Sequence, residues 1–211
     1  MIKTVLFDLD GTLIQTTKII IDTFKITFAK YFPHLTLTEE EYTNFLGHTL
    51  FMTFGYYTDS PEKVDEMVKF YREVSDEMIE KGLQSYPGAR ETIEYLKKKK
   101  VKVGVVTSKM RHVASHHLHL VGLDDLIEGI IGYEDVKEHK PAPEPIEKAL
   151  ALFSAKKEQT VYVGDHENDI VAAKKAGILT CAVTYSERLG QMLSYQPDFV
   201  IDELVNIKDL I

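Results

Sequence analysis

Five short runs of apolar, mostly β-branched residues are the feature that most constrains the fold of this 211-residue chain. Apolar and polar residues do not alternate within these runs, which is typical of strands that are buried on both faces of a parallel sheet. Segments with helical spacing separate most of the runs, so we predict an α/β fold with a doubly wound parallel sheet. The runs are Thr4–Phe7, Val103–Val106, Gly129–Gly132, Val161–Val163 and Thr180–Val183.

One stretch interrupts the alternation of strand and helix patterns. From about Lys18 to Lys81 the chain has helical patterns and no convincing buried strand, and Ser60-Pro61-Glu62 is a helix-start signal. We expect about four helices here, inserted after the first strand. The predicted domains are therefore an α/β core of residues 1–15 and 83–211 and an inserted helical subdomain of residues 16–82.

Charge and cysteine content exclude several classes of partner. Lys and Arg number 25 against 33 Asp and Glu, and no basic run is interleaved with aromatic residues, so no nucleic acid partner is expected. The single Cys181 cannot form an internal disulfide, which favours a reducing compartment. No apolar run approaches the ~20 residues of a membrane span. We predict a cytoplasmic protein that does not act at a membrane.

Chemically reactive side chains follow the predicted strands directly. The carboxyl ends of parallel strands meet at one edge of the sheet, where ligands bind. Lys140 lies in a proline-rich turn just before a predicted helix. We expect six side chains to converge at this edge: Asp8, Asp10, Thr107, Lys140, Asp165 and Asp169.

Four carboxylates at one site require a compensating positive charge. Two carboxylates ~4 Å apart repel each other by about 4 kcal/mol at an effective dielectric near 20. A Mg²⁺ ion fits best, because an all-oxygen ligand set suits a hard cation and no Cys–His set with zinc-like spacing lies nearby. An aspartate that does not bind the ion through its side chain would keep its proton. The site would then hold one anionic nucleophile and one general acid.

Four motifs in this sequence resemble those of the haloacid dehalogenase superfamily of phosphohydrolases, in order and in spacing. The inserted helices resemble the helical cap of that superfamily. Within it, residues 138–145 and 196–199 are most similar to the phosphoglycolate phosphatase and pyrophosphatase branch. The motifs are Asp8-Leu9-Asp10-Gly11-Thr12, Val105-Val106-Thr107-Ser108, Lys140-Pro141, and Gly164-Asp165 followed by Asp169.

The resemblance implies a role for each motif residue. Asp8 would attack phosphorus and form an aspartyl-phosphate, and Asp10 would protonate the leaving group and then activate water. Mg²⁺ would be bound by Asp8 and Asp165 and, at Asp10, by the backbone carbonyl. Asp169 would orient Lys140 or a water bound to the metal.

The resemblance also implies where the substrate binds. Thr107, Ser108, Lys140 and the backbone amides after Asp8 would hold the phosphoryl oxygens. In the cap, Gly47, His48 and Thr49 form the candidate substrate-facing loop, although this pattern is equally compatible with a structural turn. The substrate would be a small phosphorylated metabolite or pyrophosphate.

Two other functions use similar residues. A phosphomutase of the β-phosphoglucomutase type would isomerise a phosphosugar, but residues 39–58 contain no Lys or Arg to bind a second phosphate. A non-catalytic receiver that is only phosphorylated on aspartate is the alternative from another class. It gives no reason for the helical insertion. Hydrolysis is therefore the preferred hypothesis.

Two remaining features have ordinary structural interpretations. His112, His116 and His119 have the spacing of one helix face, which could bind a soft metal but is more typical of a solvated surface. Cys181 lies inside a predicted strand and is expected to be a small buried apolar residue, not a nucleophile.

Overall fold

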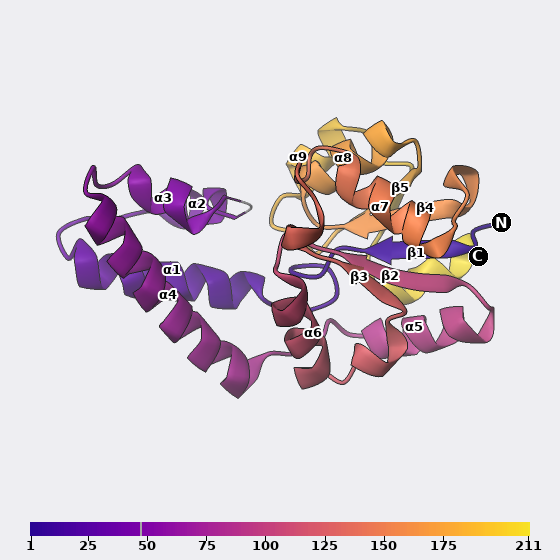
Figure 1. The fold of residues 1–211 in the computed structure, drawn as a ribbon, viewed down its shortest axis with the longest axis horizontal. Helices are drawn as coiled ribbons and strands as arrows, with labels where there is room; N and C mark the ends of the chain where they lie inside the picture. Colours follow the sequence, from indigo (N-terminus) through magenta and orange to yellow (C-terminus); the bar gives the residue numbers. More distant parts are fainter. Residues whose placement is uncertain (47) are drawn as a thin grey trace. The chain divides into compact units, whose positions relative to one another are not determined.

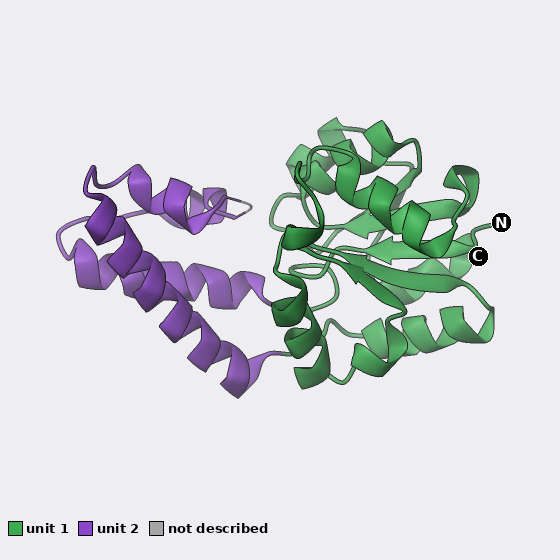
Figure 2. Ribbon diagram, viewed as in Figure 1, with its two compact units in different colours: residues 1–15, 84–211 green, residues 16–83 purple. Residues whose placement is uncertain are grey.

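The computed structural model describes residues 1–46 and 48–211, and the chain divides into two compact units (Figures 1 and 2). Residues 1–15 and 84–211 form the first, which we call the core unit. Residues 16–83 form the second, which we call the helical unit. The insertion of the helical unit divides the core unit in sequence but not in space.

The core unit is built on a parallel sheet. Its strands are β1 (Thr4–Phe7), β2 (Lys102–Val106), β3 (Gly129–Ile131), β4 (Thr160–Gly164), β5 (Leu179–Val183) and β6 (Phe199–Ile201). They lie in the order β3-β2-β1-β4-β5-β6, and every neighbouring pair is parallel. The predicted parallel α/β fold is confirmed. Strand β6, at one edge of the sheet, was not predicted.

Helices cover both faces of this sheet (Figure 1). They are α5 (Ala89–Lys98), α6 (Arg111–Leu120), α7 (Glu144–Phe153), α8 (Glu167–Ala176) and α9 (Leu189–Ser194), with 3₁₀ segments at Asp124–Leu126, Tyr133–Asp135, Lys157–Gln159 and Leu204–Leu210. On one face, α7 and α8 bury an apolar cluster against the strands, which includes Leu6, Tyr162 and Ile146. This burial is the main source of stability expected for such a layer.

The order of the strands places the candidate site next to β1. From β1 the chain adds β2 and β3 on one side and then returns to add β4, β5 and β6 on the other. The strand order therefore reverses between β1 and β4, which is where open α/β sheets bind ligands. Phe7 of β1 is paired with Val163 of β4, so Asp8 and Asp165 follow neighbouring strands at the same edge.

The helical unit contains α1 (Thr17–Tyr31), α2 (Glu39–Asn44), α3 (Leu50–Gly55) and α4 (Pro61–Gly82). Helix α4 begins at the predicted signal, where the Ser60 hydroxyl accepts a hydrogen bond from the Lys63 amide at 3.2 Å. The core of the helical unit is aromatic: the centroid of the Phe24 ring lies 4.8 Å from that of Tyr71 and 5.1 Å from that of Phe45. Across residues 1–46 and 48–211, no helix combines the length and the apolar character needed to cross a bilayer.

The two segments that lead into and out of the helical unit are hydrogen-bonded to each other within the core unit. The Gln15 amide donates to the Gln84 carbonyl at 2.8 Å, and the Tyr86 amide donates to the Leu13 carbonyl at 2.9 Å. The segments run antiparallel at this point. This paired entry and exit, which we call the stem, belongs to the core unit and directly follows the loop that carries Asp8.

Candidate active site

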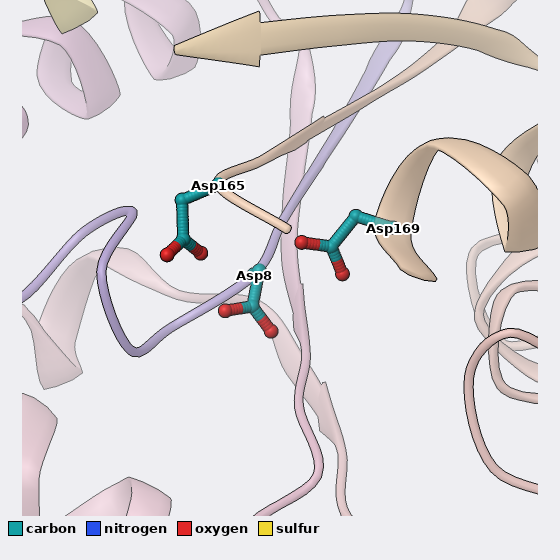
Figure 3. A group of neighbouring side chains, drawn as sticks. All are labelled: Asp8, Asp165 and Asp169. Atoms are coloured by element: carbon teal, nitrogen blue, oxygen red, sulfur yellow. The ribbon is translucent and has the colours of Figure 1, made fainter. Parts of the chain in front are cut away.

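Three aspartates gather at the edge of the sheet where the strand order reverses (Figure 3). Asp8 directly follows β1, Asp165 directly follows β4, and Asp169 lies in the first turn of α8. Each offers a carboxylate oxygen, and these atoms all lie within 4.8 Å of one another. Asp8 and Asp169 are buried and Asp165 is partly buried. The sequence motifs thus converge on one small acidic cluster.

Lys140 provides the positive charge inside this cluster. Its Nζ donates to Asp8 Oδ1 at 2.6 Å, to Asp169 Oδ1 at 2.7 Å and to the Tyr162 hydroxyl at 3.0 Å. Only 7% of the side chain is exposed. Burial alone would lower the pKa of the ammonium, but Asp169 and Asp8 raise that pKa well above its usual value. The two carboxylates therefore favour the charged form of Lys140.

The carboxylates outnumber this single ammonium. Burial raises the pKa of Asp8 from 3.8 to about 7, while Lys140 opposes that rise. Burial, followed by the charges of Asp8 and Asp169, raises the pKa of Asp165 well above its usual range. The Thr12 hydroxyl donates to Asp165 Oδ1 at 3.1 Å, which offsets only part of that cost. An all-oxygen donor set with excess negative charge fits a hard divalent cation.

The Asp10 side chain does not belong to this cluster. Its two carboxylate oxygens accept from Lys109 Nζ at 2.8 and 2.7 Å. Among the described residues, the group of side chains that could hold a metal is Asp8, Asp165 and Asp169. The Asp10 carboxylate pairs with the Lys109 ammonium, and the metal contact expected of Asp10 is through its backbone carbonyl. Sequence reasoning missed Lys109, although a lysine two residues after Thr107, at a strand end, was a usable signal.

A tight turn after Asp8 brings the chain against Asp165. Gly11 has a φ of +77°, and its amide donates to the Ile14 carbonyl at 3.0 Å. A Cβ at Gly11 would lie 2.1 Å from Asp165 Oδ2. Glycine is therefore required here both for the left-handed backbone and for the close approach.

The two predicted phosphate-binding residues after β2 differ in exposure. Thr107 is 5% exposed, and its amide donates to the Ile131 carbonyl at 2.9 Å. Its hydroxyl accepts from the Lys109 amide at 3.2 Å, which holds the turn after β2 closed. Ser108 is exposed. The Thr107 hydroxyl is thus engaged by the backbone, whereas Ser108 is a solvent-exposed residue.

The candidate loop of the helical unit is only partly described. His48 and Thr49 are exposed, and the Thr49 hydroxyl caps α3 by accepting from the Met52 amide at 3.2 Å. Gly47 lies outside the described residues. Thr49 thus has a structural role in its own unit, and within residues 1–46 and 48–211 no such capping bond involves the exposed His48 side chain.

The three histidines and the cysteine considered in the sequence analysis lie on the surface and in the core, respectively. His112, His116 and His119 are exposed on α6. Cys181 is fully buried in β5, and burial raises the pKa of its thiol to about 12. Such a thiol is protonated at neutral pH and is not a nucleophile.

Comparison with known proteins decides the family. The family model described as haloacid dehalogenase-like hydrolase matches residues 5–183. The chain belongs to the haloacid dehalogenase-like hydrolase family. Membership in this family confirms the predicted superfamily and the assignment to a hydrolase. Because the family is described as hydrolases, membership favours a hydrolysis reaction over a mutase, which isomerises its substrate, and over a receiver, which is only phosphorylated.

Individual members of the haloacid dehalogenase-like family resemble the chain along its whole length. Pyrophosphatase PpaX of Anoxybacillus flavithermus is 39% identical over 211 residues, which cover 100% of this chain and 97% of the relative. Pyrophosphatase PpaX of Bacillus cereus is 39% identical over 207 residues, 98% of this chain and 94% of the relative. A haloacid dehalogenase-like family hydrolase from Streptococcus pneumoniae has a TM-score of 0.83 at 25% identity, covering 99% and 98% of the two chains.

Proposed function

We propose that the chain is a Mg²⁺-dependent phosphohydrolase that cleaves pyrophosphate, or a closely related small phosphate ester, through an aspartyl-phosphate. The observation that carries this proposal is that the Asp8 carboxylate lies in one cluster with those of Asp165 and Asp169, with the Lys140 ammonium bridging Asp8 and Asp169 at 2.6 and 2.7 Å. Full-length relatives called pyrophosphatase, at 39% identity, support a diphosphate as the first substrate to test.

Asp8 and Asp165 would hold the metal through their carboxylates, and Asp10 through its backbone carbonyl. Bound there, Mg²⁺ would supply positive charge that keeps Asp8 ionised and offsets the charge of the phosphoryl oxygens. The donor set of the chain fits this ion, because the cluster contains three carboxylates and one ammonium within a few ångströms. Asp169, which accepts from Lys140 and from the His166 amide at 3.0 Å, would keep the ammonium in place.

The Asp8 carboxylate would attack phosphorus. One of its oxygens forms a bond to phosphorus, and the bond from phosphorus to the leaving oxygen breaks. Asp8 must be ionised to do this, and its pKa of about 7 reflects burial that Lys140 only partly offsets. Lys140 would also contact an oxygen of the transferring group, where negative charge accumulates.

Asp10 would transfer the proton in both half-reactions. Its carboxyl group would protonate the leaving phosphate in the first step. In the second it would take a proton from the water that attacks the aspartyl-phosphate, which regenerates Asp8. Lys109, at 2.8 and 2.7 Å from the two carboxylate oxygens, holds the Asp10 side chain apart from the three-aspartate cluster.

Substrate binding would use the remaining motif residues. The Thr107 and Ser108 hydroxyls and the amides that follow Asp8 would donate to the phosphoryl oxygens. The helical unit would serve as a cap, with His48, Thr49 and Gly47 as its specificity loop. A cap of this kind would exclude water and restrict which substrates react.

The test is phosphate release from pyrophosphate, measured beside phosphoglycolate, sugar phosphates and nucleotides. Asp8→Asn and treatment with EDTA should each abolish turnover, because one removes the nucleophile and the other the cation. Asp59→Asn, at an exposed position in the helical unit, should leave it unchanged. Undiminished release of phosphate by Asp8→Asn would refute the aspartyl-phosphate route. Preference for another phosphate ester would keep the route and change only the substrate.

A further inference from the structure

Tyr162 has a buried hydroxyl at the end of the sheet where the site lies. Its ring is fully buried in the apolar cluster between the strands and helices α7 and α8. A buried tyrosine hydroxyl requires hydrogen-bond partners, since leaving it unpaired costs free energy. Its partners come from two other motifs: the Val106 carbonyl at 2.8 Å and Lys140 Nζ at 3.0 Å.

The chemistry of the partners fixes the direction of both bonds. A carbonyl oxygen can only accept and an ammonium can only donate. The Tyr162 hydroxyl therefore donates its proton to Val106 and accepts one from Lys140. Since Val106 is the last residue of β2 and precedes Thr107, one hydroxyl connects the end of β2 to the Lys140 side chain.

This hydroxyl completes the set of acceptors around Lys140. The ammonium has three protons, and its three close acceptors are Asp8 Oδ1, Asp169 Oδ1 and the Tyr162 hydroxyl, at 2.6, 2.7 and 3.0 Å. The Val106 carbonyl lies farther away, at 3.4 Å. The tyrosine hydroxyl thus gives the ammonium a third close acceptor, nearer than the backbone carbonyl to which Lys140 also donates.

We propose that Tyr162 is a positioning residue for the reaction, whose hydroxyl holds Lys140 directed at Asp8 and at the transferring phosphoryl group. This inference rests on the proposed function. Removal of the hydroxyl takes one of the three close acceptors from the ammonium and leaves the Val106 carbonyl with its longer bond from Lys140, at 3.4 Å. The ammonium then turns toward Val106 and away from Asp8, so the damage falls on the chemical step.

Tyr162→Phe tests this with little change in packing, because the ring stays in place. We expect kcat for pyrophosphate to fall about tenfold or more, the size of effect typical of a misplaced hydrogen bond to a charged group. KM should change less than about threefold, because the other donors still bind the ground state. Inhibition by orthovanadate, which mimics the pentacoordinate transition state, should weaken in parallel with kcat.

Two comparisons separate positioning from a loss of stability. Tyr71→Phe, in the buried aromatic core of the helical unit, should leave kcat and orthovanadate inhibition unchanged. In a Lys140→Gln background, Tyr162→Phe should cause no further loss of kcat, because the group that it positions is gone. This comparison of Tyr162→Phe with and without Lys140 also tests the positioning role when Tyr162→Phe lowers the melting temperature.

A kcat within twofold of wild type, or the same loss with and without Lys140, would overturn the role of Tyr162. Failure of the proposed function gives a different result, because Asp8→Asn would then retain activity. An inactive Asp8→Asn together with a fully active Tyr162→Phe would reject the positioning role alone.

Discussion

Replacing Gly11 with alanine probes how closely the turn after Asp8 must approach Asp165. Gly11 has a φ of +77°, and an added Cβ would lie 2.1 Å from Asp165 Oδ2 and 2.6 Å from its carboxyl carbon. Atoms cannot remain at these distances, so the turn or the Asp165 side chain has to move. Because Asp165 is a proposed metal ligand, the substitution should impair metal binding as well as folding.

The cost to stability can be worked from the backbone alone. A left-handed backbone costs a residue with a Cβ about 1–2 kcal/mol. For a chain of this length that corresponds to a decrease in melting temperature of about 2–8 °C. Displacement of the Asp165 carboxylate adds a second effect: the Mg²⁺ concentration that gives half-maximal phosphate release should rise about tenfold or more, as expected when a ligand is displaced. Thermal unfolding and a Mg²⁺ titration of activity measure the two effects separately.

Gly122→Ala is the matched control for this experiment. Gly122 has a φ of +66°, but its added Cβ would meet nothing closer than an Arg90 nitrogen at 3.7 Å. It should show a similar loss of stability with an unchanged Mg²⁺ requirement. A Gly11→Ala enzyme with the Mg²⁺ requirement of wild type would refute the argument that this turn fixes Asp165 for metal binding.

Two further changes test other contacts. Lys109→Met should lower kcat about tenfold or more without changing the Mg²⁺ requirement, because Asp10 loses a charged partner. Lys98→Met, at an exposed position, is the control and should keep the wild-type kcat. A wild-type kcat for Lys109→Met would contradict the role of Lys109. The backbone amides of Glu138 and Lys137 donate hydrogen bonds to the Glu144 carboxylate and lower its pKa from 4.5 to about 2. The ionised form of Glu144 therefore stabilises the fold above pH 4.5. This contribution is lost as the pH falls toward 2. Glu144→Gln should therefore have a lower melting temperature than wild type at pH 7, and the difference should shrink toward pH 2; a difference independent of pH would contradict this.

Strand ends and strongly periodic helices were predictable from the sequence. The helix predicted after the proline-rich turn at Lys140 is present as α7 (Glu144–Phe153), because its apolar spacing is regular and its proline-rich start is distinct. Strand β6 was missed, since Phe199–Ile201 has only three residues and no pattern of its own. Its place depends on distant contacts, among them Asp198 accepting from the Thr180 amide and hydroxyl at 2.8 and 2.7 Å.

Contacts between residues distant in sequence also limited the prediction of the site. The four motifs identify Asp8, Lys140 and Asp165 because each follows a strand or precedes a helix. Nothing local assigns the Asp10 carboxylate to Lys109, since that pairing depends on how two loops meet. Tyr162 was read as one more apolar residue of a buried strand. Its hydroxyl was the available signal, because a polar atom in such a strand must find a partner.

The stem has a consequence for how proteins of this architecture change over evolution. Gln15 and Gln84 are bonded neighbours although 68 residues separate them. A short turn could therefore bridge them without disturbing the sheet, and helices of another size or number could be accommodated just as well. Natural exchange at this point would replace the proposed cap and leave Asp8, Lys140 and Asp165 in the core unit untouched. Swapping or excising residues 16–83 is therefore the direct laboratory test of whether substrate choice depends on the helical unit.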